Sequence, residues 1–229
     1  MIEDATTGYD LFRVIKKITT EFGYKAFIAM RLPALGDERI ADLAIVTNWD
    51  PELIRAYDSM SLICHSPIVQ ALRQSVLPIC WDIETINANR SDDKKDVVIE
   101  LFREFGHVRG IYFSVSDKHG NRGAFGFSGD RPPPDHNEKM MLSYLTSHAF
   151  EHLIRNEVSS SSAKEMLTER ERDCIQWTAA GKTSAEVASI LEISENTVNH
   201  YLSTASLKLN TVNKAHTVAR AIRLGLITT

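Results

Sequence analysis

A run of four serines at residues 159–162 divides this 229-residue chain into two parts with different patterns. Serine side chains do not bury apolar surface, so such a run is typical of a linker. We therefore expect one domain over residues 1–157, a linker over 158–165 and a second domain over 166–229. The chain length suits two domains, since one domain commonly takes about 100–200 residues.

The first part mixes helical and strand-like periodicity. The expected elements are a helix over 9–22, strands over 26–32 and 43–46, helices over 51–60, 67–73 and 92–105, strands over 110–115 and 122–127, and a helix over 135–156. This order predicts an α/β/α sandwich with a mostly antiparallel sheet. Because the second part, described next, is helical, the fold class expected for the whole chain is α+β.

The second part carries helical patterns throughout. Thr168 and Glu171 have the spacing of a capping box, and Gly181 is placed to end the helix that follows. A short helix over 184–191, a tight turn and a longer helix that begins after Ser194 have helix-turn-helix spacing. With a last helix over 214–224, this predicts an all-α four-helix domain.

The longer helix leaves a polar face once its buried stripe is assigned. The residues expected to contact DNA are Asn196, Thr197, Asn199, His200, Ser203 and Lys208 on this helix, with Lys182 and Thr183 before the turn. Short hydrogen-bonding side chains suit base edges, and a helix N-terminus favours phosphate. Residues 166–229 hold seven Lys and Arg against six Asp and Glu, whereas the whole chain has a net charge of −4. The pattern alone also allows an interaction module with a solvated face.

The second part closely resembles the LuxR-type helix-turn-helix of bacterial transcription regulators. Its motifs are residues 167–171, Gly181-Lys182-Thr183, residues 186–188 and Thr197-Val198-Asn199-His200, which follow one another in unbroken register. Glu171, Ile175 and Gly181 fall on three characteristic family positions, of which the middle one is usually Leu. The resemblance implies binding of double-stranded DNA as a dimer. Asn199 and Ser203 stand where many members have a basic or longer polar residue, so the operator sequence does not transfer.

The first part is similar to the autoinducer-binding domain of the quorum-sensing LuxR regulators. The chain keeps the family's aromatic or structural residues at Trp49, Tyr57, Pro67, Trp81 and Gly110. The resemblance implies a ligand site made by Trp49, Leu53, Tyr57, Ser66, Trp81 and Gly126.

Three of these implied ligand residues depart from the family pattern. Leu53 replaces a Trp whose indole donates to the lactone carbonyl, and Ser66 replaces an Asp that accepts from the ligand amide. Gly126 stands at a position that is usually Ser or Thr. The resemblance thus implies a site whose acyl-homoserine lactone anchors are partly lost.

These observations together predict a cytoplasmic, homodimeric DNA-binding transcription regulator with an atypical or absent lactone response. Three alternatives stay open. In one, the first domain is a ligand-independent dimerisation module. In another, the chain is an antagonist that forms mixed dimers with a related regulator. In the third, the chain is an ordinary lactone receptor. The expected partners are double-stranded DNA, a second copy, a small ligand and a related regulator.

Other patterns favour neither catalysis nor a membrane. His148-Ala149-Phe150-Glu151-His152 has the inverted zinc-protease spacing, but a catalytic zinc needs a third protein ligand and an open position. Cys64 and His65 are adjacent in sequence, which does not by itself make a nucleophile and base. Three cysteines without a CxxC pair fit a reducing compartment, and no apolar stretch reaches the ~20 residues of a membrane span. We expect no catalytic residue, metal or cofactor.

Overall fold

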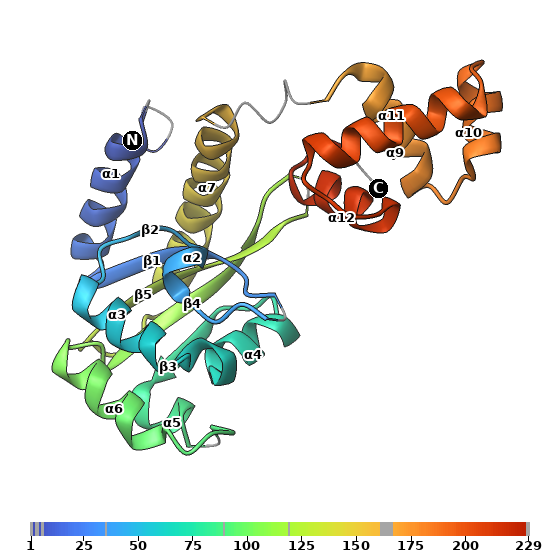
Figure 1. Cartoon of the computed structure of the whole chain (residues 1–229). Helices are drawn as coiled ribbons and strands as arrows, with labels where there is room; N and C mark the ends of the chain where they lie inside the picture. The colour runs from blue at the N-terminus through green and yellow to red at the C-terminus, as the bar shows by residue number, and fades with distance from the viewer. Residues whose placement is uncertain are drawn as a thin grey trace. The chain divides into compact units, whose positions relative to one another are not determined.

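The computed structural model describes residues 2, 5, 7–34, 36–88, 90–118, 120–160 and 167–227, with the backbone alone at 156–160 and 223. The chain forms two compact units, Met1–Asn156 and Glu157–Thr229. The first is a sheet covered by helices on both faces, and the second is helical (Figure 1). This confirms the predicted fold class.

The sheet of the first unit has five strands in the order β2-β1-β5-β4-β3, and every neighbouring pair is antiparallel. The strands are β1 (Ala26–Arg31), β2 (Ala44–Thr47), β3 (Ile79–Asp82), β4 (Arg109–Ser116) and β5 (Arg122–Gly129). The hairpin of β4 and β5 pairs Tyr112 with Gly126 at its centre. These two residues therefore lie side by side on the sheet.

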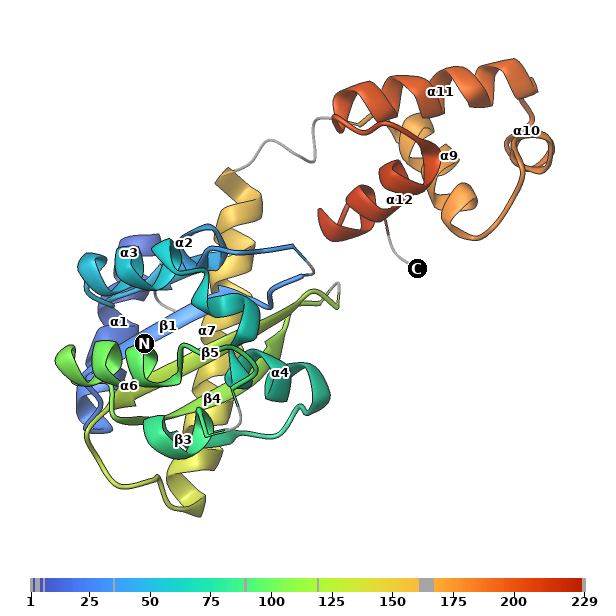
Figure 2. The same cartoon turned by 60° about the horizontal axis from the view of Figure 1, so that its bottom comes forward.

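Helices cover each face of this sheet and enclose a separate core there (Figure 2). One face is covered by α1 (Gly8–Glu21) and the long α7 (His136–Ser160), which bury Leu11, Leu142 and Phe150. The other face carries α2 (Ile40–Leu43), α3 (Pro51–Ser59), the 3-10 helix η1 (Leu62–His65), α4 (Pro67–Gln74), α5 (Ile83–Ile86) and α6 (Lys95–Glu104). Because strand side chains alternate between faces, β1, β2, β4 and β5 contribute to both cores, whereas β3 contributes only to the core under α2 to α6.

Side-chain caps fix where several helices begin. Thr7 forms a capping box with Asp10 at the start of α1. Asp50 caps α3 and Ser66 caps α4, and in each helix a proline occupies the first position. A proline is well placed there because its missing N–H would have no partner in the first turn. These caps determine where α3 and α4 begin.

The second unit contains α9 (Glu169–Ala179), α10 (Ser184–Leu191), α11 (Glu195–Lys208) and α12 (Lys214–Arg223). Thr168 and Glu171 form the predicted capping box of α9, and Ser194 caps α11. A tight turn joins α10 to α11, with Glu192 in the left-handed backbone region at φ 56°. The core of this unit includes Ile175, Val187 and Val198. This is the predicted helix-turn-helix arrangement.

Several boundaries differ from the sequence expectation. The edge strand β3 and the helices α2 and α5 were not predicted, because each has only four residues and shows no clear periodicity. Helix α7 continues to Ser160 rather than ending near 156, so residues 158–160 of the expected linker are helical. The remaining linker residues, 161–165, lie outside the described residues.

Candidate ligand cavity and nucleic-acid interface

A cavity of about 50 Å³ lies between the sheet and the helices α3 to α6. Its walls come from β1, β3 and β4 and from the helices, and most are apolar. They include Met30, Ile40, Trp49, Tyr57, Ile63, Ser66, Val69, Trp81, Ile83, Asn87, Arg90, Val98, Phe102 and Tyr112. Pockets for drug-sized ligands span about 300–1,000 Å³. A ligand here must be compact or must displace side chains.

Trp49 and Trp81 line the cavity, and their buried indole nitrogens have no hydrogen-bond partner within the protein. Trp49 and Trp81 are 6% and 7% exposed, and both indole nitrogens are buried. The Trp49 ring packs edge-on against Phe102 and His107, with centroids 5.6 and 5.2 Å away. The Trp81 ring lies over Gly110, where an added Cβ would come within 2.7 Å of it. Close packing therefore fixes both donors.

Two tyrosines add hydroxyl groups to the same wall. Burial raises the pKa of Tyr57 to about 12, and the neighbouring Ser66 hydroxyl lowers it by a smaller amount. Burial and the nearby Tyr57 also raise the pKa of Tyr112. Ser66 accepts the Val69 backbone N–H at 3.4 Å as the cap of α4. Both tyrosines are protonated at neutral pH, and the Ser66 oxygen is partly engaged.

A buried ion pair lies at the edge of the cavity. The guanidinium of Arg90 is 1% exposed, contacts the Asp92 carboxylate and donates to the Leu62 carbonyl at 2.7 Å. Burial alone would raise the pKa of Asp92, but the hydrogen bond and charge of Arg90 outweigh it and hold that pKa below its ordinary value. The positive charge of Arg90 is thus compensated within the protein.

His107 lies behind Trp49 and is neutral at physiological pH. Burial and the positive charge of Lys25 lower the pKa of His107 to about 4. Its Nδ1 lies 2.7 Å from the Ser128 hydroxyl. His107 therefore supports the Trp49 ring without contributing a charge.

Four of the six residues expected to bind a ligand line this cavity: Trp49, Tyr57, Ser66 and Trp81. The other two do not line it. Leu53 is fully buried in the core, and Gly126 lies beneath the Tyr112 ring, which a Cβ would approach to 2.3 Å. Sequence reasoning missed Tyr112, Asn87 and Arg90. Strand alternation would have placed Tyr112 on this face, but no sequence signal located the other two.

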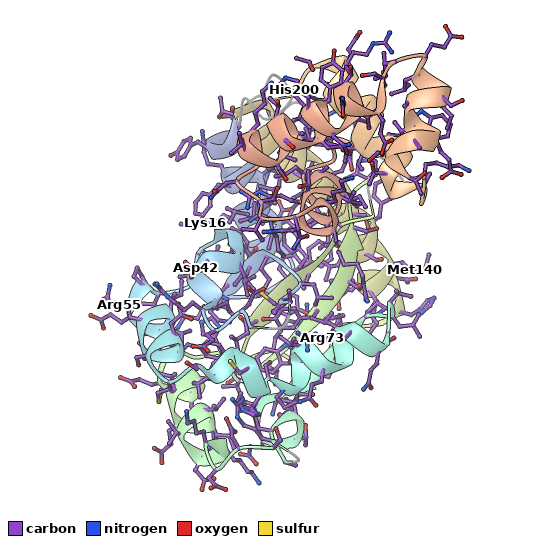
Figure 3. All side chains as sticks on the ribbon, turned by 45° about the vertical axis from the view of Figure 1, so that its right-hand side comes forward. Lys16, Asp42, Arg55, Arg73, Met140 and His200 are labelled. Atoms are coloured by element: carbon purple, nitrogen blue, oxygen red, sulfur yellow. The ribbon has the colours of Figure 1, made fainter. Side chains whose placement is uncertain are left out.

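The polar face of α11 is only partly exposed. Asn196, Ser203 and His200 are exposed, as Figure 3 illustrates for His200. Thr197 is half-buried, and its hydroxyl lies 2.7 Å from that of the cap residue Ser194. These three side chains lie on the outer surface of the helix.

Two residues expected at the DNA surface have partners within the unit. The Asn199 side-chain oxygen accepts from the Ser184 hydroxyl at 2.8 Å and from the Lys214 ammonium at 3.3 Å. Lys208 pairs with the buried Glu171 carboxylate at 2.8 Å. These contacts join α11 to α9, α10 and α12. Sequence reasoning missed Ser184 and Lys214, which only the tertiary fold brings beside Asn199.

Lys182 and Thr183 stand at the start of α10. Thr183 caps this helix through the Glu186 N–H, and Lys182 lies 3.8 Å from the Glu186 carboxylate in an exposed ion pair. The amide groups of the first turn of α10 lie next to the Lys182 charge. Such a helix N-terminus suits a phosphate group.

The motif with zinc-protease spacing lies on α7. The ring centroids of His148 and Tyr144 lie 4.4 Å apart. The Nε2 atom of His152 lies 2.9 Å from a guanidinium nitrogen of Arg155. Across the described part of the chain, no three His, Cys, Asp or Glu side chains are grouped to hold a metal. No described helix is both long and apolar enough to cross a membrane.

The fold defines a class: an α/β/α domain that encloses a small cavity, joined in one chain to a helix-turn-helix domain. Residues 9–153 match the family model of the autoinducer binding domain, and residues 165–221 match that of bacterial regulatory proteins of the luxR family. The chain therefore belongs to the LuxR family of transcription regulators with an autoinducer-binding domain.

Relatives support this assignment along nearly the whole chain. The transcriptional activator protein AnoR of Acinetobacter nosocomialis is 30% identical over 227 residues, covering 95% of this chain and 92% of AnoR. AhyR of Aeromonas hydrophila, also a transcriptional activator protein, is 28% identical over 229 residues, covering 97% and 87%. These relatives are regulators rather than enzymes.

Solved structures share the fold. The crystal structure of Escherichia coli SdiA has a TM-score of 0.74 at 24% identity and covers all of this chain and 95% of SdiA. SdiA in complex with octanoyl-rac-glycerol has a TM-score of 0.76 at 23% identity, with 100% and 93% covered. At this identity the likeness concerns the fold.

Proposed function

We propose that this regulator binds a specific DNA operator as a homodimer, in the cytoplasm, through the exposed face of α11. The observation that carries the proposal is the helix-turn-helix itself, whose second helix presents exposed short polar side chains. Such a helix lies in the major groove and reads base edges. Two half-sites about one helical turn apart would then be bound by two copies.

The contacts within the unit divide the expected DNA residues by role. Asn196, His200 and Ser203 are exposed and are the proposed base-reading residues. Lys182 and Thr183 are the proposed phosphate contacts at the start of α10. Because Asn199 and Lys208 already have partners, they are proposed to hold α11 in position against its neighbours. Thr197 supports the N-terminus of the same helix.

Selection of bound DNA from a random pool tests this proposal with the full chain. The wild-type protein is expected to enrich one operator with two-fold symmetry and to bind it with the mass of a dimer. The double variant Asn196→Ala and His200→Ala is expected to lose that selectivity while it keeps dimer mass and helical content. Ser189→Ala, an exposed position on α10, serves as the control. Equal operator affinity of the double variant would overturn the assignment of α11.

For the first unit, we infer that ordinary acyl-homoserine lactones are not required ligands. Leu53 has no hydrogen-bond donor and is fully buried, and the Ser66 oxygen already accepts a backbone N–H. A cavity of about 50 Å³ also leaves little room for an acyl chain. A lactone at one hundred times its Kd would stabilise the protein by ~2.7 kcal/mol. Thermal unfolding with and without N-hexanoyl-homoserine lactone is expected to give the same midpoint. Submicromolar binding of this lactone would overturn the inference and show that the chain is an ordinary lactone receptor.

A further inference from the structure

Lys214, the first residue of α12, places its ammonium where three helices of the second unit meet. The ammonium donates to the Ser184 hydroxyl of α10 at 2.8 Å and to the Asn199 side-chain oxygen of α11 at 3.3 Å. The Ser184 hydroxyl in turn donates to the same Asn199 oxygen at 2.8 Å, so the three side chains form one closed network. This network joins the first turns of α10 and α12 to the N-terminal half of α11.

The network holds the Lys214 ammonium without neutralising it. Both acceptors are uncharged, and among the described residues Lys214 forms no ion pair with a carboxylate. Lys182 and Lys208, in contrast, each pair with a glutamate. An ammonium has three N–H donors, and the two protein oxygens use two of them. Because Lys214 is also exposed, its full positive charge and one donor remain for a further partner.

This charge lies beside the surface proposed to bind DNA. Ser184 directly follows Thr183, a proposed phosphate contact at the start of α10, and Asn199 is adjacent to the proposed base-reading residue His200. In helix-turn-helix complexes the second helix lies in the major groove while the first helix crosses the DNA backbone. A cation held between these two helices therefore suits a phosphate at the border of the groove.

We propose that Lys214 binds a backbone phosphate of the operator and that Ser184 and Asn199 position its ammonium for this contact. The inference rests on the proposed DNA binding by α11, and it assigns Asn199 to a phosphate contact through Lys214 rather than to base readout. A free lysine side chain loses much conformational freedom when it binds a phosphate. Here the two neutral oxygens order the side chain before DNA arrives, whereas a carboxylate in their place would cancel the charge.

Equilibrium binding of the full chain to operator DNA at several salt concentrations tests the phosphate contact. Loss of one contact reduces the slope of log K against log salt by about 0.9, which corresponds to about eightfold weaker binding at about 0.1 M salt. Lys214→Met is expected to show this loss, and Lys214→Arg, which keeps the charge, is expected to retain the wild-type slope. Arg220→Met is the control, because it removes an equal exposed charge about 9 Å farther along α12. An unchanged slope for Lys214→Met would overturn the proposal.

A scan with neutral phosphates tests whether the contact is direct. Each operator phosphate is replaced in turn by an uncharged methylphosphonate, and the affinities of the wild type and of Lys214→Met are compared. One position in each half-site is expected to weaken wild-type binding about eightfold and to leave binding by Lys214→Met unchanged. If every replacement weakened both proteins equally, Lys214 would contact no phosphate.

Asn199→Ala tests the positioning role, because it removes one of the two acceptors of the ammonium. It is expected to weaken binding to the operator and to a random-sequence duplex by the same factor of about three, since both present phosphates. A base-reading Asn199 would instead affect the operator alone. In the Lys214→Met background, Asn199→Ala is expected to have no further effect on binding. An equal effect in both backgrounds would show that Asn199 does not act through Lys214.

The outcomes separate this inference from the proposed function. If the wild type selects an operator and Lys214→Met binds it with the same affinity and slope, the Lys214 contact alone is wrong. If the wild type binds no DNA, the proposed function and this inference are both wrong. Circular dichroism checks that each variant keeps its helices. Should Lys214→Met lose helical content, Lys214→Gln, which keeps a hydrogen-bond donor without the charge, replaces it in the same measurements.

Discussion

At the residue scale, Tyr112 takes the space that a side chain at position 126 would need. The two residues face each other across β4 and β5, and a Cβ on Gly126 would lie 2.3 Å from the Tyr112 ring. The glycine is therefore required by a neighbour rather than by its backbone angles. Tyr112 in turn fills part of the ligand face of the sheet, which helps to explain why the cavity is small.

The first prediction follows from that contact. Gly126→Ser is expected to lower the free energy of unfolding by ~2 kcal/mol, because the Tyr112 ring must leave its place. Urea unfolding measures the change. Gly8→Ala is the control, since a Cβ there meets no atom within 4 Å. If Gly126→Ser is as stable as Gly8→Ala, Tyr112 does not pack as described.

His107 provides a second prediction at this scale, in its pH dependence. Its pKa of about 4 lies below the ordinary value of about 6.5, so the unfolded chain binds a proton that the folded chain rejects. The stability of the first unit is therefore expected to fall as the pH drops from about 6.5 towards 4, by up to about 3 kcal/mol.

His107→Gln removes this titration and keeps a side chain that can hydrogen-bond Ser128. Urea unfolding at several pH values is expected to give a smaller loss of stability for the variant than for the wild type between pH 6.5 and 4.5. Equal pH slopes would show that His107 does not titrate below its ordinary range.

At residue level, the sequence predicted part of the cavity lining. Trp49, Tyr57, Ser66 and Trp81 converge on the cavity as the family resemblance implied. Asn199 and Lys208 are predicted DNA contacts because sequence periodicity places them on the polar face of α11. Their partners come from α9, α10 and α12, and a one-dimensional pattern cannot identify contacts between distant segments.

At the element scale, local signals predicted most helices and their starts. The caps at Thr168 and Ser194 and the Asp50-Pro51 pair mark helix starts in the structure as in the sequence. The strand β3 was not predicted, because it has only four residues at the sheet edge and only Trp81 among them is buried. Its place depends on pairing with β4, which involves residues about thirty positions away.

The ion pair between α9 and α11 gives a prediction about elements. Burial would raise the pKa of Glu171, but hydrogen bonds from Lys208 and the Thr168 backbone hold it below its ordinary value. Lys208→Met leaves this buried carboxylate without its cation and is expected to destabilise the second unit by ~2 kcal/mol in urea unfolding. Lys182→Met, in an exposed pair, is expected to cost less than about 0.5 kcal/mol.

The same two variants separate packing from DNA contact. Lys182→Met is expected to weaken operator binding and to reduce the slope of log K against log salt by about one. Lys208→Met is expected to leave that slope unchanged at temperatures where the variant is folded. If Lys208→Met reduced the slope and Lys182→Met left it unchanged, Lys208 rather than Lys182 would be the phosphate contact.

At the scale of the whole molecule, each compact unit has its own hydrophobic core. The first unit has a core on each sheet face, and the second has one core among its helices. Because apolar burial supplies most of the folding free energy, units with separate cores form separate cooperative transitions. Calorimetry of the full chain is therefore expected to resolve two unfolding transitions.

Two matched core substitutions assign these transitions. Ile175→Ala empties a fully buried position in the second unit, and Leu142→Ala does the same in the first. Each removes ~3 kcal/mol through lost burial and the cavity left behind. A small unit responds with a larger shift of its midpoint, so Ile175→Ala is expected to lower one transition by ~10 °C or more and leave the other in place. Leu142→Ala is expected to lower only the other transition, by a smaller amount. If either substitution moved both transitions together, the two units would fold as one cooperative body, and the sensor would be coupled to the DNA-binding helices through stability itself.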